Sequence, residues 1–297
     1  MIRRKKTMNL ELETLGKEEC GEPKAFNLEH AHELDSHVHF FPEKHIYTFD
    51  NQLQISVSSL ISECFPVFDC ERKAERLSSP SHSKEQILEE WESQGKEARD
   101  TGTFMHQQIE RKLLGLQEER SFSFQYNGAY VKCQKEIGIS HELSLFDEFL
   151  QGECPLSYRT EWRICDEEHG VAGTIDYLAT DAEGYFIMYD WKRSNKIGYE
   201  GVREFVVQRD NKFGRQALGR LSHLGDTAYM HYCLQQNLYR YILKRHYDIE
   251  LAHMYLVVLH PANVNYHCVE VPPMDAETQI LLEYALEKNS EQETLCL

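Results

Sequence analysis

Residues 185–192 read Tyr-Phe-Ile-Met-Tyr-Asp-Trp-Lys, and this stretch decides the fold. Its apolar run has the length and composition of a β-strand. Just upstream, residues 173–178 supply a second run of the same character, and Asp-Ala-Glu-Gly at residues 181–184, between the two runs, predicts a hairpin turn. Two adjacent antiparallel strands would carry Asp176 and Asp190 to neighbouring positions, with Lys192 on the same face as Asp190.

Two carboxylates and one ammonium group that converge at a strand end can hold a hard divalent cation and act on a phosphodiester. The alternative is an ordinary hairpin whose charged side chains face water. For an isolated Asp-x-Lys that alternative is the better interpretation. The rest of the chain therefore has to decide between the two.

The composition is that of a folded globular protein, with 41% hydrophobic and 11% aromatic residues over 297 positions, enough for one elaborated domain or two. No apolar run approaches the ~20 residues that a membrane span needs. The basic start, residues 1–6, is not followed by the apolar region of a secretory signal. We therefore expect an intracellular protein, cytoplasmic or nuclear, that is neither secreted nor bound to a membrane.

Nine cysteines are spread along the sequence without a C-x-x-C pair, at positions 20, 64, 70, 133, 154, 165, 233, 268 and 296. This spacing argues against a structural zinc site or an iron–sulfur cluster. Reduced thiols are expected instead of a disulfide framework.

The net charge of −17 is unevenly distributed. Residues 191–246 hold eleven Lys and Arg against four Asp and Glu, a charge of +7, which leaves −24 for the remainder. This basic segment begins at the suspected active strand, where a polyanion would lie. We expect substrate contacts from Arg193, Arg209, Lys212 and Arg215; solvated surface cations are the alternative for each. The acidic remainder could serve protein partners.

Three regions are expected in chain order. Residues 1–35 are predicted to be a mobile charged tail, residues 36–100 a hairpin with a helical elaboration, and residues 101–297 the core with a C-terminal helix. Gly95 and Gly102 are expected to interrupt the helical pattern that follows Ser83.

The core is predicted to contain helix, three strands, helix and strand, in that order. A helix over 103–114 would place His106 and Glu110 one above the other, although a surface hydrogen bond or a half-buried histidine is the better interpretation of such a pair taken alone. A further helical region is expected over 124–151, and strand 158–165 carries Glu161. Residues 193–225 read as a long loop over the site. The remaining predicted elements are a helix over 228–244, a buried strand over 253–260 and a last helix over 275–289.

Four short motifs in this order resemble those of the PD-(D/E)xK nuclease superfamily, in particular its RecB-like branch, which includes the CRISPR-associated exonucleases and the mitochondrial genome maintenance exonuclease. They are Gly102–Glu110, a helical His motif; Gly173-Thr174-Ile175-Asp176; Asp190-Trp191-Lys192; and Gln235–Tyr239, a Q-x-x-x-Y motif. The likeness covers about residues 100–260 and is weaker over 45–66. It implies an α/β fold with a restriction-endonuclease-like core, a central mixed sheet flanked by helices, carrying an N-terminal α-helical elaboration. The branch's iron–sulfur cysteines are absent, so no cluster is expected.

The chemistry of phosphodiester hydrolysis assigns a role to each candidate. Asp176 and Asp190 would bind Mg²⁺ or Mn²⁺, with the Trp191 carbonyl as a further ligand, and the imidazole of His106 would favour Mn²⁺. Lys192 would orient or help deprotonate the attacking water.

Glu161 could join the metal ligands or receive a proton; its alternative is a salt bridge to Arg159 or Arg163. Gln235 and Tyr239 would line the cleft and contact the DNA backbone or the Lys192 amine, with helix packing as the alternative.

The sequence therefore predicts a divalent-metal-dependent deoxyribonuclease, exonuclease-like and with a preference for single strands or ends, in replication, repair or recombination. Two alternatives remain: a nucleic-acid-binding or assembly protein that keeps the fold without turnover, and another metal-dependent phosphoesterase.

Overall fold

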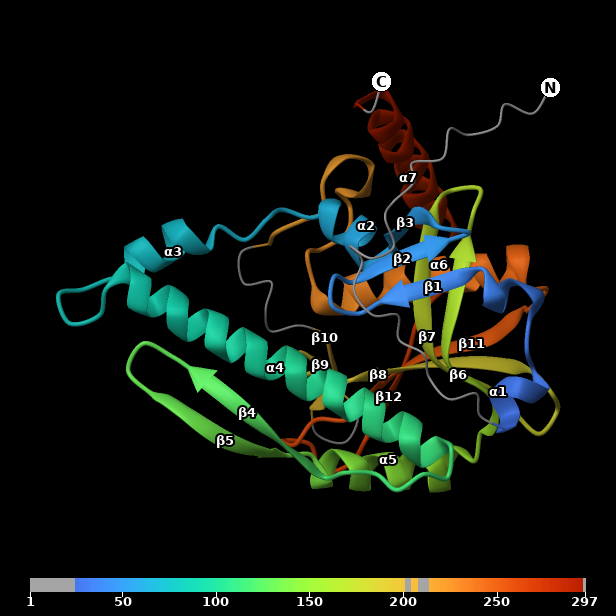
Figure 1. The fold of residues 1–297 in the computed structure, drawn as a ribbon, viewed down its shortest axis with the longest axis horizontal. Coiled ribbons are helices and arrows are strands. Elements are labelled where there is room, and N and C mark those ends of the chain that lie inside the picture. The colour runs from blue at the N-terminus through green and yellow to red at the C-terminus, as the bar shows by residue number, and fades with distance from the viewer. Residues whose placement is uncertain (1–24, 201–203, 208–213, 296–297) are drawn as a thin grey trace.

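The structure, a computed structural model, describes residues 25–200, 204–207 and 214–295. Within these residues the chain forms a mixed α/β fold in which seven α-helices surround a central eight-stranded sheet (Figure 1). The predicted α/β class with a mixed sheet flanked by helices is confirmed.

The sheet runs β1-β2-β3-β7-β8-β11-β12, and β6 pairs with the other edge of β7. Its pairs are antiparallel except β3–β7 and β8–β11, which are parallel. The strands span β1 (Val38–Phe41), β2 (Ile46–Phe49), β3 (Gln52–Ser56), β6 (Leu156–Asp166), β7 (Val171–Thr180), β8 (Phe186–Lys192), β11 (Leu251–Val258) and β12 (His267–Glu270). The predicted hairpin of β7 and β8, the strand before it and the buried strand after it are thus confirmed.

Helices cover both faces of this sheet. One core packs the sheet against α2 (Val57–Glu63), α6 (Ala228–His246) and α7 (Asp275–Leu295), with Leu60, Leu238 and Leu281 among its buried members. A second core on the opposite face contains Met105 and Phe146 and packs against α4 (Lys84–Leu113) and α5 (Ser140–Glu153). The strands between them are buried on both faces, which explains their nearly continuous apolar sequences.

The helix α4 is continuous over 30 residues, contrary to the predicted interruption at Gly95 and Gly102. Ser83 caps its N-terminus in a capping box with Gln86. Each helical glycine costs about 1 kcal/mol relative to alanine, and burial of Ile87, Met105 and Ile109 along the same helix offsets that cost.

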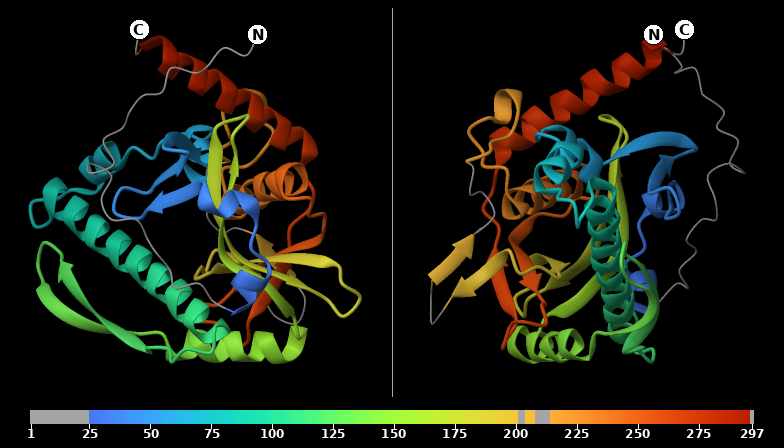
Figure 2. Two further views of the ribbon diagram at one scale, coloured as in Figure 1. Left: turned by 45° about the vertical axis from the view of Figure 1, so that its right-hand side comes forward. Right: turned by 90° about the vertical axis from the view of Figure 1, so that its left-hand side faces the viewer.

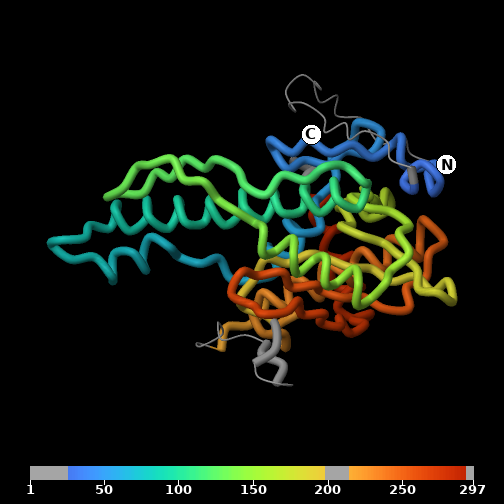
Figure 3. Tube along the Cα trace, turned by 90° about the horizontal axis from the view of Figure 1, so that it is seen from below, coloured from blue at the N-terminus to red at the C-terminus, as the bar shows by residue number. Residues whose placement is uncertain are grey.

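The helix predicted over 124–151 is wrong in its first half. Residues 121–138 form a hairpin of β4 (Ser121–Asn127) and β5 (Lys132–Gly138), and α5 begins only at Ser140. Phe124 and Tyr126 are buried, while Gln125 between them and the flanking Ser123 and Asn127 are exposed, a period of two that identifies a strand. With α3 (Cys70–Leu77) and α4, this hairpin forms an arm that extends from the body (Figure 3).

The beginning of the described chain is packed against the sheet. Residues 25–36, which we name the N-terminal segment, contain α1 (Ala25–Glu29) and the 3-10 helix η2 (Glu33–Ser36) and lie along β6 (Figure 2). Asp35 accepts hydrogen bonds from Arg159 Nη1 and Trp162 Nε1, each 2.8 Å long. The predicted mobile tail therefore does not extend to residue 35, and its first 24 residues lie outside those described.

Two further expectations concern organisation. Residues 193–225, predicted as a loop, contain β9 (Ile197–Glu200), β10 (Glu204–Val207) and the short 3-10 helix η3 (Gly219–Leu221). The expected boundary near residue 100 falls inside α4, and β3 joins the N-terminal strands to the central sheet. Among the described residues, no helix combines the length and apolar character needed to cross a membrane.

Candidate metal centre

The candidate site lies where β7 changes its neighbour. On one edge, β7 pairs with β3 at residues 171–172 and with β8 at residues 177–180. Residues 173–176 between them, which we name the β7 fork, have no strand pairing on this edge in the described chain. Side chains instead of a neighbouring backbone fill the gap, and these side chains make the site.

Glu161 reaches the fork from β6 through an unusual backbone conformation. The β6–β7 register pairs Thr160 with Tyr177 and Trp162 with Ile175, so Glu161 falls between these pairs, across from Asp176. Its φ is +46°, the left-handed region, which is uncommon for a residue other than glycine and strained inside a strand. Strain of this kind persists only where the surroundings enforce it, and it marks Glu161 as a residue whose carboxylate direction matters.

The alternation of β7 side chains shifts by one position at the same point. Val171, Ile175 and Leu178 all pack into the first core, whereas Tyr177 and Ala179 pack into the second. A regular strand would keep all odd-numbered residues on one face. The alternation of β7 therefore changes at Asp176, between Ile175 and Tyr177, across from the left-handed Glu161.

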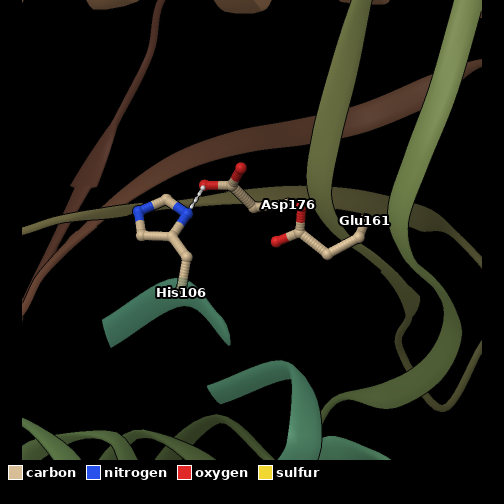
Figure 4. A group of neighbouring side chains, drawn as sticks. All are labelled: His106, Glu161 and Asp176. Atoms are coloured by element: carbon tan, nitrogen blue, oxygen red, sulfur yellow. Dashed lines mark ion pairs between the residues drawn. The ribbon is translucent and has the colours of Figure 1, made fainter. Parts of the chain in front are cut away.

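Asp176 forms the centre of the group. Its Oδ2 accepts the main-chain N–H of Trp191 at 2.9 Å and lies 3.5 Å from His106 Nδ1 (Figure 4). Burial alone would raise the pKa of this carboxyl, but the His106 charge, with Lys192 and the Trp191 N–H, holds it below its usual value. Asp176 is therefore an anion in the folded protein.

His106 comes from the last third of α4 and bridges the two central strands. Its Nε2 lies 3.0 Å from the Trp191 carbonyl, while Nδ1 faces Asp176. Burial lowers the pKa of His106, but the charge and hydrogen bond of Asp176 outweigh it and raise the pKa to about 9. The Trp191 carbonyl, which we expected as a metal ligand, is engaged by this imidazole.

His106, Glu161 and Asp176 each offer one ligand atom, and the three atoms lie within 4.8 Å of one another (Figure 4). Two carboxylate oxygens and one imidazole nitrogen fit a hard or borderline divalent cation, and the nitrogen favours Mn²⁺ over Mg²⁺. Among the described residues, this is the one group of three His, Cys, Asp or Glu side chains whose ligand atoms lie close enough together to share a metal ion. The donor set thus fits the Mg²⁺ or Mn²⁺ expected from the sequence.

Asp190 and Lys192 form a buried ion pair beside this group. Lys192 Nζ lies 2.5 Å from Asp190 Oδ2 and 4.4 Å from the ring centroid of Tyr232 on α6. Burial raises the pKa of Asp190 to about 6, against the opposing charge of Lys192. Burial would lower the pKa of Lys192, but the charges of Asp190 and Asp176 raise it to about 12. Lys192 is therefore a cation at neutral pH.

Gln235 and Tyr239 lie on α6, one turn apart. Gln235 Nε2 donates to the Tyr239 hydroxyl at 3.1 Å, and Tyr239 is 5% exposed. The Tyr239 ring lies so close to Gly173 that a Cβ at that position would be 2.4 Å from Tyr239 Cε1. In this structure Tyr239 packs against the β7 fork, which agrees with helix packing, the alternative to a contact with DNA or the Lys192 amine.

Of the four basic residues predicted to contact the substrate, the two that the structure describes, Arg193 and Arg215, are engaged with acidic side chains. Arg193 Nε donates to the buried Glu142 at 2.8 Å, and Arg215 Nε donates to Asp226 at 2.8 Å. Arg209 and Lys212 lie outside the described residues. Glu110 lies one turn beyond His106, where it lines a surface cavity with Phe104 and Arg111.

Two residues at the fork were not expected from the sequence. Tyr47 on β2 is hydrogen-bonded through its hydroxyl to Thr174 Oγ1 at 3.0 Å, and Tyr232 provides the aromatic face under Lys192. Burial raises the pKa of Tyr47 to about 12, so it stays a neutral hydrogen-bonding group. Tyr232 lies about two turns before the predicted Tyr239 in the same helix, but nothing in the spacing marked Tyr47.

Comparisons with known proteins give little beyond this geometry. No family model matches the sequence, and no curated protein is similar to it. Among solved structures, the chain is similar to the crystal structure of SSO0001, with a TM-score of 0.25 and 16% sequence identity. The match covers 49% of this chain and 56% of that one, so it spans about half the length of SSO0001. Function must therefore be argued from the site itself.

Proposed function

We propose that this protein is a divalent-metal-dependent nuclease of the PD-(D/E)xK type that hydrolyses phosphodiester bonds of DNA. The observation that carries the proposal is the group of His106, Glu161 and Asp176, three ligand atoms within 4.8 Å, next to the buried pair of Asp190 and Lys192. This combination of anionic ligands and a fixed cation suits a phosphate ester.

Each residue has a distinct part in the proposed reaction. His106, Glu161 and Asp176 would hold the cation, and Asp190 lies close enough to Lys192 to fix its ammonium group. A divalent cation held there supplies a Lewis acid that polarises the phosphate and offsets its charge. Lys192 adds a positive charge for the developing phosphorane charge, and its raised pKa favours this electrostatic role over proton abstraction.

The wider setting of the proposal follows the sequence. The substrate would be DNA, single-stranded or with an accessible end, in replication, repair or recombination. We propose an intracellular location, cytoplasmic or nuclear, because the described cysteines are thiols and not half-cystines. The acidic surface outside residues 191–246 would be open to protein partners.

The test is cleavage of labelled linear and circular DNA and RNA, single- and double-stranded, in Mg²⁺, Mn²⁺ or EDTA. DNA cleavage should require the metal and fall by ~10–100-fold in Asp190→Asn, the range for substitution of a residue that supports a metal centre without binding the ion. Asp275→Asn is the matched control, because that side chain is 85% exposed on α7. Cleavage that survives in EDTA, or equally in both variants, contradicts the proposal.

A further inference from the structure

The strained conformation of Glu161 needs a cause, and the outer edge of β6 supplies one. Within the described residues, β6 pairs with β7 alone, so its other edge has no strand neighbour. The N-terminal segment lies along that edge (Figure 2). The contacts it makes there concentrate on the residues either side of Glu161.

The side chain of Asn27 takes the place of a neighbouring strand at Thr160. Its Oδ1 accepts the Thr160 main-chain N–H at 2.9 Å, and its Nδ2 donates to the Thr160 carbonyl at 3.1 Å. Both main-chain groups of one residue are thus bonded by one amide side chain. The Thr160 hydroxyl in turn donates to the Asp176 carbonyl at 2.9 Å, which ties the same residue to β7.

The bond from Asn27 Nδ2 to the Thr160 carbonyl acts directly on the φ angle of Glu161. The Thr160 carbonyl and the Glu161 N–H belong to one peptide plane, and rotation of that plane about the Glu161 N–Cα bond is the change in φ. A donor fixed on the carbonyl therefore resists the rotation that would return φ from +46° to the favoured negative range.

Asp35 holds the chain on either side of this plane. It accepts hydrogen bonds from Arg159 Nη1 and Trp162 Nε1, and His30 stacks on Tyr158 with ring centroids 3.9 Å apart. The N-terminal segment is thereby anchored at several points. Asn27 is the member that bonds the backbone next to Glu161.

We propose that Asn27 is a positioning residue for the metal centre: by fixing the Thr160–Glu161 peptide plane, it holds Glu161 in the left-handed conformation that directs its carboxylate at His106 and Asp176. The inference rests on the metal centre of the proposed function and deepens it. The N-terminal segment lies far from the metal ligands in the sequence, yet it then determines whether the Glu161 carboxylate is in place.

The experiment measures Mn²⁺ affinity by calorimetry in the full-length protein, without substrate. Asn27→Ala should weaken Mn²⁺ binding by ~10-fold, the loss typical for a partner that orients a metal ligand. In a Glu161→Ala background the same substitution should change the affinity by less than about twofold, because the carboxylate it positions is gone. Asn27→Asp keeps the acceptor for Thr160 N–H but loses the donor to the carbonyl, and it too should weaken binding, despite the added negative charge.

The matched control is Asn289→Ala. Asn289 Nδ2 also donates to a main-chain carbonyl of the β6–β7 hairpin, that of His169 at 2.8 Å, but at the turn far along the strand from Glu161. It should leave Mn²⁺ affinity within about twofold. A melting curve of each variant checks that it folds. If Asn27→Ala does not fold, the affinity of Asn27→Asp is compared with that of the wild type instead.

The outcomes separate the two proposals. Equal Mn²⁺ affinity in wild type and both Asn27 variants, equal losses in Asn27→Ala and Asn289→Ala, or an undiminished Asn27 effect without the Glu161 carboxylate overturns the positioning role alone. Failure of the wild type to bind Mn²⁺ overturns the metal centre and the positioning role together. Metal binding with the expected Asn27 coupling but no cleavage of nucleic acid overturns the nuclease proposal and leaves Asn27 in its role.

Discussion

The main-chain N–H of Trp191 on β8 donates to Asp176 Oδ2 on β7 over 2.9 Å. Regular β7–β8 pairing ends just before this point, at Tyr177 and Tyr189. A carboxylate therefore replaces the backbone carbonyl that a continuing ladder would offer. The bond fixes the width of the β7 fork and explains why the site forms where two strands separate.

The His106–Asp176 pair should make metal-free stability depend on pH. The pKa of His106 is raised to about 9 from 6.5 in the folded protein, so the stability it contributes is fully present below pH 6.5 and is lost as pH rises through about 9. Denaturant melts of wild type in EDTA should show this decline. In His106→Gln and Asp176→Asn the decline over this window should flatten; an unchanged slope in both would contradict the pairing.

Metal binding should release protons from two groups. The pKa of the ligand His106 is about 9, so a cation competes directly with its proton. Burial raises the pKa of Asp190, which lies beside the ligands, to about 6, and the charge of a bound cation disfavours its proton. Mn²⁺ affinity should rise steeply through pH 6 and continue to rise towards pH 9. In His106→Gln it should level off above pH 6–7. Calorimetry at several pH values checks this, and a pH-independent affinity in the wild type would count against the assigned ligands.

Lys192 should act as a fixed cation. Lys192→Met should lower cleavage by roughly 100-fold, as for loss of one group that stabilises developing charge. Lys73→Met, exposed on α3 and outside residues 191–246, serves as the control. Because its pKa is about 12, Lys192 stays protonated between pH 7 and 10. The wild-type cleavage rate should therefore show no increase over this range that is absent in Lys192→Arg. Such a rise would identify Lys192 as a proton acceptor.

The ring of Tyr232 should support the Lys192 charge. Tyr232→Phe, which keeps the ring under Nζ, should lower the cleavage rate less than Tyr232→Ala.

The contact between Gly173 and Tyr239 should be necessary for the shape of the fork. In Gly173→Ala the new Cβ would meet the Tyr239 ring at 2.4 Å, an overpacking that costs ~1–3 kcal/mol. Gly138→Ala on β5 is the control, since its nearest contact would be 3.8 Å away. Thermal melts should show destabilisation in the first variant alone. The double variant Gly173→Ala/Tyr239→Leu should recover part of it, and full additivity would contradict the direct contact.

Much of the core was predictable from periodicity because its strands are long and apolar. The β7–β8 hairpin, with Asp190 and Lys192 on one face, follows from alternation and one turn signal. The hairpin at 121–138 could not be told from a helix by its sequence, because the buried Phe124 and Tyr126 with exposed neighbours give only a short alternating pattern. The continuity of α4 could not be read from its glycines, since burial elsewhere on the helix compensates for them.

The site was predictable in its residue types but not in its geometry. Strand spacing pointed to Asp176, and the resemblance to the nuclease motifs pointed to His106. The left-handed φ of Glu161, by contrast, arises from contacts with Asn27, which lies 133 positions from Thr160 in the sequence. Tyr47 reaches Thr174 across a comparable separation of 127 positions. Such contacts depend on the folded sheet, and no local pattern announces them.

The most direct test of the metal centre is anomalous diffraction at the manganese edge from crystals of the protein grown or soaked with Mn²⁺. We predict a single strong peak at the β7 fork, within ligand distance of His106, Glu161 and Asp176, that disappears in Asp176→Asn crystals. Strong density elsewhere, with none among these three side chains, would contradict the central claim.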